Sequence, residues 1–450
     1  MKLIRHMIPV DIGNNQKLIV NSLNGLIDRM EASTFEILAK WQKCKVIVPE
    51  NDLEAELYNV LQSRGYLVKS YEEEIAKKNR MVKFLRDKHA EVKQKPNRIT
   101  FVMTYNCNFR CPYCFEEGRV VKKEVITPEL IDAALKLVGD DLETVGLFGG
   151  EPLLPSTRPA LEYLISQVPD KAFSITTNGY YLVEFFDLLS TIKISEIMVT
   201  LDGEEDAHNK RRYLANGAPT FQKIMQGIQK YLENNIPVCI RMNIDKGNYD
   251  KANNLKAHLL EKFAEHGELL SFETSPMMRM DRAERNDILE KLYSEDIDFS
   301  HDGRQQRNRF MGRFNPMVNA LTGVAKPRPT YSFCYAHMNS YLVDPFGLIY
   351  PCLLSVGVEE LAIGTYYPEI NFKENGINSR NIETIPECRE CIYSLLCGGG
   401  CPLRLPQYDD LMRPVCFNVS NQIHNILPKF YLAEQCKNQA LRKLSIRAKE

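Results

Sequence analysis

The sequence predicts an α/β protein with a central parallel sheet, and two observations in its 450 residues support that prediction. Between residues 98 and 280, six short runs rich in β-branched and aromatic residues alternate with amphipathic segments of helical period. Short glycine-containing motifs follow several of these runs, as expected where strands end. Strands separated by helices pair in parallel, so the sheet is either doubly wound or curled into a partial barrel.

The partial barrel is expected to be a TIM-like (β/α)6 unit that spans residues 98–280. Its strands are expected at residues 98–104, 144–150, 172–179, 196–203, 236–243 and 269–276, and its principal helices at 128–138, 158–168, 220–235 and 249–266. In such sheets the carboxyl ends of the strands carry the chemistry.

The segments on either side of the barrel have different patterns. Residues 1–75 combine strand-like runs with helical periodicity, which fits a small winged-helix-like domain. These runs lie at 2–10, 16–22, 35–41 and 53–65. The other expected parts are a charged linker helix at 76–97, bridging helices at 281–330, a Gly-, Pro- and Cys-rich domain at 331–418 with short strands at 340–344 and 348–352, and a terminal helix at 419–450.

Composition and charge narrow the class of protein. A hydrophobic fraction of 44% and a charged fraction of 26% are typical of a globular chain, and a net charge of −1 argues against binding to nucleic acid through bulk electrostatics. The first residues lack a secretory signal and no run is apolar enough to span a bilayer, so a cytoplasmic protein without a membrane partner is expected. Thirteen unevenly clustered cysteines then indicate metal ligation rather than disulfides.

Three cysteines stand together directly after the first expected strand. Cys107, Cys111 and Cys114 form a C-x3-C-x2-C run, which is one ligand short of the four that a structural zinc site takes. A cubane 4Fe–4S cluster has four irons, so three thiolates leave one iron open. The amino and carboxylate groups of a methionine moiety form a suitable bidentate pair for that iron.

The cysteine spacing and three strand-end motifs resemble the radical S-adenosylmethionine (SAM) superfamily. The motifs are FGGEP at 148–152, TTNG at 176–179 and VTLDG at 199–203. The resemblance implies SAM contacts from the tyrosine before the third cysteine, the Gly-Gly-Glu turn, hydroxyl residues at two strand ends and an arginine after the fourth strand. These residues are Tyr113, Gly149, Gly150, Glu151, Thr177, Thr200 and Arg212, with Arg211 as a rival to Arg212.

The resemblance also implies the chemistry. An electron from a reduced cluster cleaves SAM to methionine and a 5′-deoxyadenosyl radical, which takes a hydrogen atom from an unactivated C–H bond. A low-potential donor of the flavodoxin or ferredoxin type is expected to supply the electron. The sequence assigns no catalytic acid or base: Asp202 and Glu151 lie nearest the expected site, and Glu151 is expected to bind SAM.

Seven further cysteines occupy the last quarter of the chain. Cys334 and Cys352 flank Gly347, and a C-x2-C-x5-C-x3-C run with a later cysteine comprises Cys388, Cys391, Cys397, Cys401 and Cys416. The pattern resembles the SPASM domain of radical SAM maturases, which carries two auxiliary 4Fe–4S clusters. A pair of zinc ribbons is the alternative.

The SPASM resemblance implies how these thiols divide. One auxiliary cluster would be held by Cys388, Cys391, Cys397 and Cys416, and the other by Cys334, Cys352 and Cys401, which makes three 4Fe–4S clusters in the chain. The second auxiliary cluster lacks a fourth thiol, whose place His337 could take. Our hypothesis is that this position receives the thiolate of a substrate cysteine.

The first domain indicates the substrate. Its pattern resembles the leader-binding element of maturases that act on ribosomally made peptides, which take up an extended peptide by strand addition. A structural cap on the barrel is the alternative.

Together these features predict an oxidoreductase that forms a thioether crosslink in a precursor peptide. Carbon–carbon crosslinking, epimerisation and sulfatase-type oxidation of Cys or Ser are rivals within the same class. A zinc-bearing winged-helix transcription factor is the alternative from a different class, and it leaves the three strand-end motifs unexplained.

Overall fold

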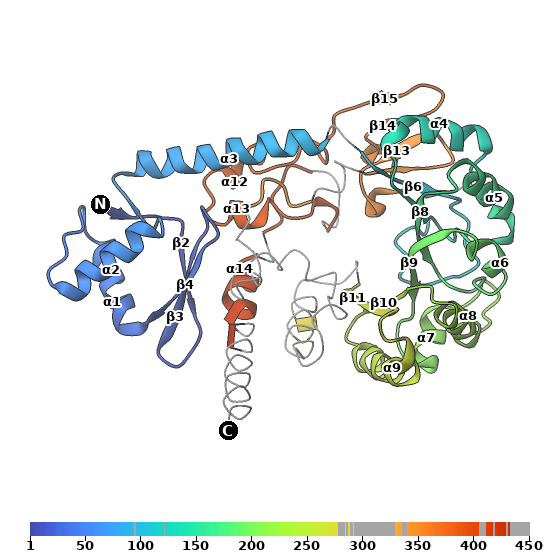
Figure 1. Ribbon diagram of the computed structural model, residues 1–450, viewed down its shortest axis with the longest axis horizontal. Helices are drawn as coiled ribbons and strands as arrows, with labels where there is room; N and C mark the ends of the chain where they lie inside the picture. The colour runs from blue at the N-terminus through green and yellow to red at the C-terminus, as the bar shows by residue number, and fades with distance from the viewer. Residues whose placement is uncertain are drawn as a thin grey trace.

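Figure 1 shows a computed structural model of the chain, which describes residues 1–93, 96–120, 122–277, 284, 287–288, 291, 329–334, 340–404, 411–416, 419–428 and 431–432. Most of the expected bridge at 281–330 lies outside the described residues, as does His337. The described part of the terminal segment is helical. Among the described helices, none is both long and apolar enough to cross a bilayer.

Six parallel strands form the centre of the fold, and they lie in the sheet in the order in which they follow one another along the chain. They are β6 (Arg98–Val102), β7 (Thr144–Phe148), β8 (Ala172–Thr177), β9 (Lys193–Thr200), β10 (Val238–Ile244) and β11 (Leu270–Pro276). All six predicted strands are confirmed. Because the order never reverses, the doubly wound alternative is wrong and the sheet is wound as in a barrel.

Helices cover the outer face of these strands (Figure 1). They are α4 (Pro128–Val138), α5 (Arg158–Gln167), α6 (Phe186–Leu189), α7 (Glu205–Arg211), α8 (Phe221–Glu233) and α9 (Tyr249–Lys262). The sequence explains where α4 begins, because the Thr127 side chain accepts a hydrogen bond from the Leu130 amide. Buried residues recur along α8 at helical spacing, which includes Ile224 and Ile228. The four predicted helices are confirmed, whereas α6 and α7 were not predicted.

Side chains alternate between the two faces of the strands. In β10, Ile240 and Met242 are buried against the helices in one hydrophobic core. Between them, Arg241 points to the opposite face and forms an ion pair with Glu273 of β11 at 2.9 Å. The inner face of the sheet therefore carries charged side chains, which suits the wall of a binding site.

The cysteine-rich region extends the same sheet. β12 (Ser340–Val343) pairs in parallel with β6, and three antiparallel strands follow it to complete a ten-stranded sheet. These strands are β13 (Leu348–Tyr350), β14 (Gly364–Thr365) and β15 (Asn371–Phe372). The Tyr105 hydroxyl donates to the Asp344 carboxylate at 2.9 Å across this junction. The cysteine-rich region is thus fixed beside the strand that precedes Cys107.

The first domain contains a three-stranded antiparallel sheet in the order β2-β3-β4. Its elements are β1 (Lys2–Leu3), β2 (Met7–Asp11), β3 (Gln16–Asn21), β4 (Ile27–Glu31), α1 (Ala32–Gln42), α2 (Asp52–Ser63), β5 (Leu67–Val68) and α3 (Tyr71–Lys93). The run predicted as one strand at 2–10 is two strands, because the chain turns between them, and β4 was not predicted. The predicted domain boundary at residue 75 falls inside α3. The winged-helix assignment stays a prediction.

The first domain packs on the cysteine-rich region, which lies between it and the barrel in Figure 1. Trp41 and Val68 share a hydrophobic core with Ile385 and Leu395. On α3, the buried Lys78 ammonium donates to the main-chain oxygen of Arg389 at 2.6 Å. These contacts join the domain to the cysteine-rich region, and the alternative that it caps the barrel stays open.

Candidate active site at the carboxyl ends of the strands

The Gly-Gly-Glu turn after β7 docks against the loop that carries the first three cysteines. The Gly150 amide donates to the Thr104 oxygen at 2.9 Å and the Glu151 amide to the Asn106 oxygen at 2.8 Å. A Cβ atom would stand 2.3 Å from the Thr104 oxygen at Gly149 and 2.4 Å from the Asn106 oxygen at Gly150. Both glycines are therefore required by the neighbouring loop, and their predicted contact with SAM is an additional, untested role.

Two predicted SAM contacts bond to each other. The buried Glu151 carboxylate accepts hydrogen bonds from the Thr177 hydroxyl at 2.6 Å and from the Asn178 amide at 2.7 Å. Burial raises the pKa of Glu151, and these hydrogen bonds oppose that rise. The pair fastens the end of β7 to the end of β8. Thr200, a third predicted contact, is the buried last residue of β9.

Asn178 is a residue of this site that the sequence did not single out. Its side-chain amide donates to the Asn108 side-chain oxygen at 2.8 Å and lies 3.9 Å from the Cys107 sulfur. The sequence signal that could have identified Asn178 as a site residue is its position in the TTNG motif. Asn178 links the third strand end to the cysteine loop.

Burial raises the pKa of all three thiols of the cysteine loop. It raises the pKa of Cys107 to about 12, with the Glu151 charge adding to the rise, and it raises the pKa of Cys111 and Cys114 as well. Such thiols ionise when a metal takes the place of the proton. Within the described ranges, no three His, Cys, Asp or Glu side chains are close enough to hold a single metal ion. A cubane has a different requirement, because each thiolate binds a different iron.

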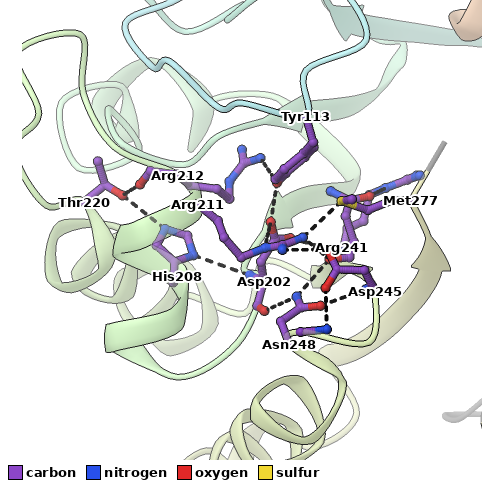
Figure 2. A network of polar contacts seen from close by, with 12 residues as sticks. Tyr113, Asp202, His208, Arg211, Arg212, Thr220, Arg241, Asp245, Asn248 and Met277 are labelled. Carbon is purple, nitrogen blue, oxygen red and sulfur yellow. Dashed lines mark hydrogen bonds and ion pairs between the residues drawn. The ribbon is translucent and has the colours of Figure 1, made fainter. Parts of the chain in front are cut away.

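A polar network fixes Tyr113 at the mouth of the barrel (Figure 2). Its hydroxyl donates to the buried Asp202 carboxylate and accepts a hydrogen bond from Arg212 at 2.8 Å. Asp202 also accepts the Asn243 amide at 3.0 Å. Burial raises the pKa of Tyr113, and the charge of Arg212 opposes the rise. The cysteine loop is thus joined to the ends of β9 and β10.

The two neighbouring arginines have different surroundings (Figure 2). Arg211 is engaged by the Asp245 carboxylate at 2.8 Å, the Asn243 oxygen at 3.3 Å and the Met277 sulfur at 3.1 Å. Arg212 is buried, and its Nε atom has no hydrogen-bond partner. A buried, unpartnered guanidinium donor can receive a ligand carboxylate. The geometry therefore favours Arg212 over Arg211 as the carboxylate ligand.

His208 of α7 and Thr220, the residue before α8, hold Arg212 in place. The Asp202 amide donates to His208 Nδ1 at 3.4 Å, so His208 is neutral and protonated at Nε2, which lies 3.1 Å from the Thr220 hydroxyl. Thr220 in turn donates to the Arg212 oxygen at 2.6 Å. Burial and the two arginines lower the pKa of His208 well below its usual value. No motif in the sequence pointed to His208 or Thr220.

The thiols predicted to hold the first auxiliary cluster lie near one another. Burial raises the pKa of Cys388 to about 12 and of Cys397 to about 11, and the charges of Cys391 and Cys416 contribute to both increases. In the other predicted set, Cys352 and Cys401 pack on one small hydrophobic cluster with Leu361, Ile377 and Leu403. The division of these thiols between two auxiliary clusters stays a prediction.

The three thiols after the first strand and the buried arginine at the barrel mouth stand where the radical SAM resemblance predicted them. Residues 101–259 match the model of the Radical SAM superfamily. The chain therefore contains a radical SAM domain, as its motifs predicted.

Two curated relatives are similar in sequence over most of their own length. The probable GTP 3′,8-cyclase of Archaeoglobus fulgidus is 29% identical over 292 residues, which cover 60% of this chain and 89% of the relative. The sporulation killing factor maturation protein SkfB of Bacillus subtilis is 24% identical over 299 residues, which cover 66% of this chain and 68% of the relative.

Two solved structures share the fold. Native anSMEcpe, with bound AdoMet and the Kp18Cys peptide, is 20% identical with a TM-score of 0.57, and the match covers 77% of this chain and 99% of that chain. SuiB of Streptococcus suis, bound to S-adenosylmethionine, is 14% identical with a TM-score of 0.50 and covers 92% of this chain and 98% of its own. At these identities the likeness establishes the fold alone.

Proposed function

We propose that this chain is a peptide maturase that forms a thioether crosslink in a ribosomally made precursor peptide. The observation that supports it most is the packing of the first domain directly on the cysteine-rich region. That packing joins a predicted peptide-binding domain and the predicted auxiliary clusters into one unit beside the radical SAM domain.

Each residue of the candidate active site has a role in this proposal. Cys107, Cys111 and Cys114 hold three irons of one cluster, and the free Nε of Arg212 receives the SAM carboxylate. Tyr113 orients Arg212 and is itself held by Asp202. When bound, the cluster and SAM supply the radical that removes a hydrogen atom from the peptide.

The peptide partner is supported by the relatives and by the first domain. SkfB is named as a maturation protein, and anSMEcpe was solved with a peptide bound. In the three-stranded sheet, β4 pairs with β3 and occupies an edge. An edge strand offers backbone donors and acceptors to an extended leader segment.

The thioether is proposed because the second predicted set of auxiliary-cluster thiols has only three members. The crosslinking reaction also balances in atoms and electrons. Cys334, Cys352 and Cys401 leave one position for the sulfur of a substrate cysteine. The S–C bond replaces one S–H and one C–H bond, so the peptide loses two protons and two electrons. One electron leaves with the hydrogen atom that passes to the adenosyl group, and the other replaces the electron used to cleave SAM. The proposal includes a low-potential electron donor and a cytoplasmic location.

The test is mass spectrometry of a cysteine-containing precursor peptide after anaerobic incubation with the protein, SAM and a reductant. We expect a loss of two hydrogens and one thiol that no longer reacts with an alkylating agent. A loss of two hydrogens with every thiol still reactive would favour carbon–carbon crosslinking. An unchanged mass in H2O, together with a gain of about one mass unit at one α-carbon when the reaction is run in D2O, would favour epimerisation.

A further inference from the structure

Arg380 is a buried charged residue that no sequence motif marks. Its exposed fraction is 4%. A buried guanidinium is costly unless its donors are paired, so its contacts indicate what the fold requires of it. It lies in the cysteine-rich region, eight positions before Cys388.

The donors of Arg380 bind main-chain oxygens on two loops. On the first loop they reach Gly399 at 2.7 Å and Gly400 at 3.4 Å. On the second loop they reach Arg413 at 2.7 Å and also Leu411. The first loop joins Cys397 to Cys401, and the second leads to Cys416. The planar guanidinium of Arg380 therefore binds the segments that carry three predicted ligands, Cys397, Cys401 and Cys416.

The first loop is a turn that only glycine permits. Gly398, Gly399 and Gly400 have φ values of 66°, 87° and 75°. A Cβ atom would stand 2.3 Å from the Phe333 nitrogen at Gly398 and 2.2 Å from the Val415 oxygen at Gly400. Phe333 precedes Cys334 and Val415 precedes Cys416, so the turn is pressed between further ligand segments.

Arg380 also reaches the Cys334 segment through its own backbone. The Ser332 hydroxyl donates to the Arg380 oxygen at 3.0 Å. Arg380 therefore also contacts the segment that leads to Cys334.

We propose that Arg380 is the positioning residue of the auxiliary cluster domain. It holds the segments of Cys334, Cys397, Cys401 and Cys416 in ligand geometry. This inference depends on the proposed cluster-bearing domain. Loss of the planar guanidinium should loosen the ligand loops of the auxiliary clusters.

The experiment compares Arg380→Gln and Arg380→Lys with Arg413→Gln in the full-length, anaerobically reconstituted protein. Arg413 is an exposed arginine of the same region and serves as the matched control. Iron per chain and the rate of cluster loss to a chelator are measured. The wild type and Arg413→Gln are expected to bind about twelve irons, four for each of three cubanes.

Arg380→Gln is expected to lose about four to eight irons and to keep about four at the Cys107 site, which also shows that the barrel is folded. Arg380→Lys retains the charge but not the planar guanidinium with its several donors. This variant should therefore bind iron and lose it to the chelator faster than the wild type. Wild-type iron content and a wild-type rate of cluster loss in both variants would overturn the inference. If the wild type itself binds only about four irons, the auxiliary clusters and this inference are refuted together, while the radical SAM domain stands.

Discussion

The two thiol-rich regions of the molecule are held in place by different means. The Cys107 loop is positioned by strand ends, because the turn after β7 and the Glu151–Thr177 pair are consequences of parallel pairing. The Cys388–Cys416 region has short elements, and its loops depend on a glycine turn and on Arg380. In a sheet, many backbone hydrogen bonds fix the position of a loop at the strand ends. In an irregular region, a few side chains fix it.

The largest expected effect is on the radical site itself. Replacing Cys107, Cys111 and Cys114 together by alanine should reduce 5′-deoxyadenosine to the level without enzyme, because the irons that SAM needs lose their ligands. Chromatography of the anaerobic reaction measures the product. Cys44→Ser, at a partly exposed thiol outside the clusters, should leave the yield at the wild-type level. Product formation by the triple variant would mean that the loop is not the radical site.

Glycine substitutions test the comparison directly. Gly149→Ala and Gly398→Ala would each place Cβ 2.3 Å from a backbone atom, at Thr104 and Phe333 respectively. Such overpacking costs about 1–3 kcal/mol, in addition to the strain of the positive φ. Thermal unfolding of the apoprotein should show the larger loss for Gly398→Ala, because no strand supports its turn.

Gly217→Ala is the matched control for Gly398→Ala, whose φ is similar. Gly217 has a φ of 82° and no atom within 4 Å of the added Cβ, so it reports the backbone strain alone. A loss as large as that of Gly398→Ala would show that the close contacts contribute little. Equal losses for Gly149→Ala and Gly398→Ala would contradict the difference between the two regions.

The two arginines at the barrel mouth give the next effect. Arg212→Met should weaken SAM binding by about 10- to 100-fold, since a charge-assisted hydrogen bond contributes about 1.5–3 kcal/mol. Arg211→Met should chiefly lower stability, because it leaves the Asp245 carboxylate without its ion pair. Anaerobic calorimetry of SAM binding to the reconstituted protein separates the two. A greater loss of affinity in Arg211→Met would reverse the assignment.

His208 should make stability depend on pH. Its pKa in the folded protein lies well below 6.5, so the unfolded chain binds the proton more readily. The free energy of unfolding should therefore fall as the pH drops below about 6.5, by at most about 1.4 kcal/mol per pH unit. Urea unfolding of the apoprotein at pH 7.5 and 5.5 measures the difference. His208→Gln should reduce that difference, and an unchanged value would assign the dependence to other groups.

The smallest effect is expected on α3, where it meets the cysteine-rich region. The exposed Arg86–Glu383 pair, with 51% and 37% of its side chains accessible, should contribute less than about 1 kcal/mol. On the same helix, Lys78→Met removes a buried donor from the Arg389 oxygen. This substitution should lower the free energy of unfolding by about 1–3 kcal/mol. Thermal unfolding of Arg86→Ala and Lys78→Met measures both. A larger loss in Arg86→Ala would mean that surface charge, rather than the buried contact, holds the helix.

Much of the barrel could be predicted because its signals are local. The runs that became β6 to β11 have β-branched residues and helices between them, and those patterns need only neighbours along the chain. The same holds for the cysteines after β6 and for the glycines after β7. The predicted boundary at residue 75 falls inside α3, whose helical pattern continues without a break to Lys93.

Contacts between distant segments could not be predicted in this way. Three contacts join residues whose spacing carries no periodic signal. They are the pairing of β12 with β6, the hydrogen bond between His208 and Thr220, and the hydrogen bonds of the Arg380 guanidinium. β4 was missed because its residues Ile27–Glu31 alternate weakly and three of the five are charged.

By itself, the sequence determined which residue types stand at each strand end, and with them the class of chemistry. The tertiary structure decided which of two adjacent arginines keeps a free donor, which carbonyls a buried guanidinium must satisfy, and which region the first domain rests on. The physical reason is that ligand chemistry depends on side-chain type and local spacing, whereas hydrogen-bond partners depend on which buried groups the whole fold brings within reach.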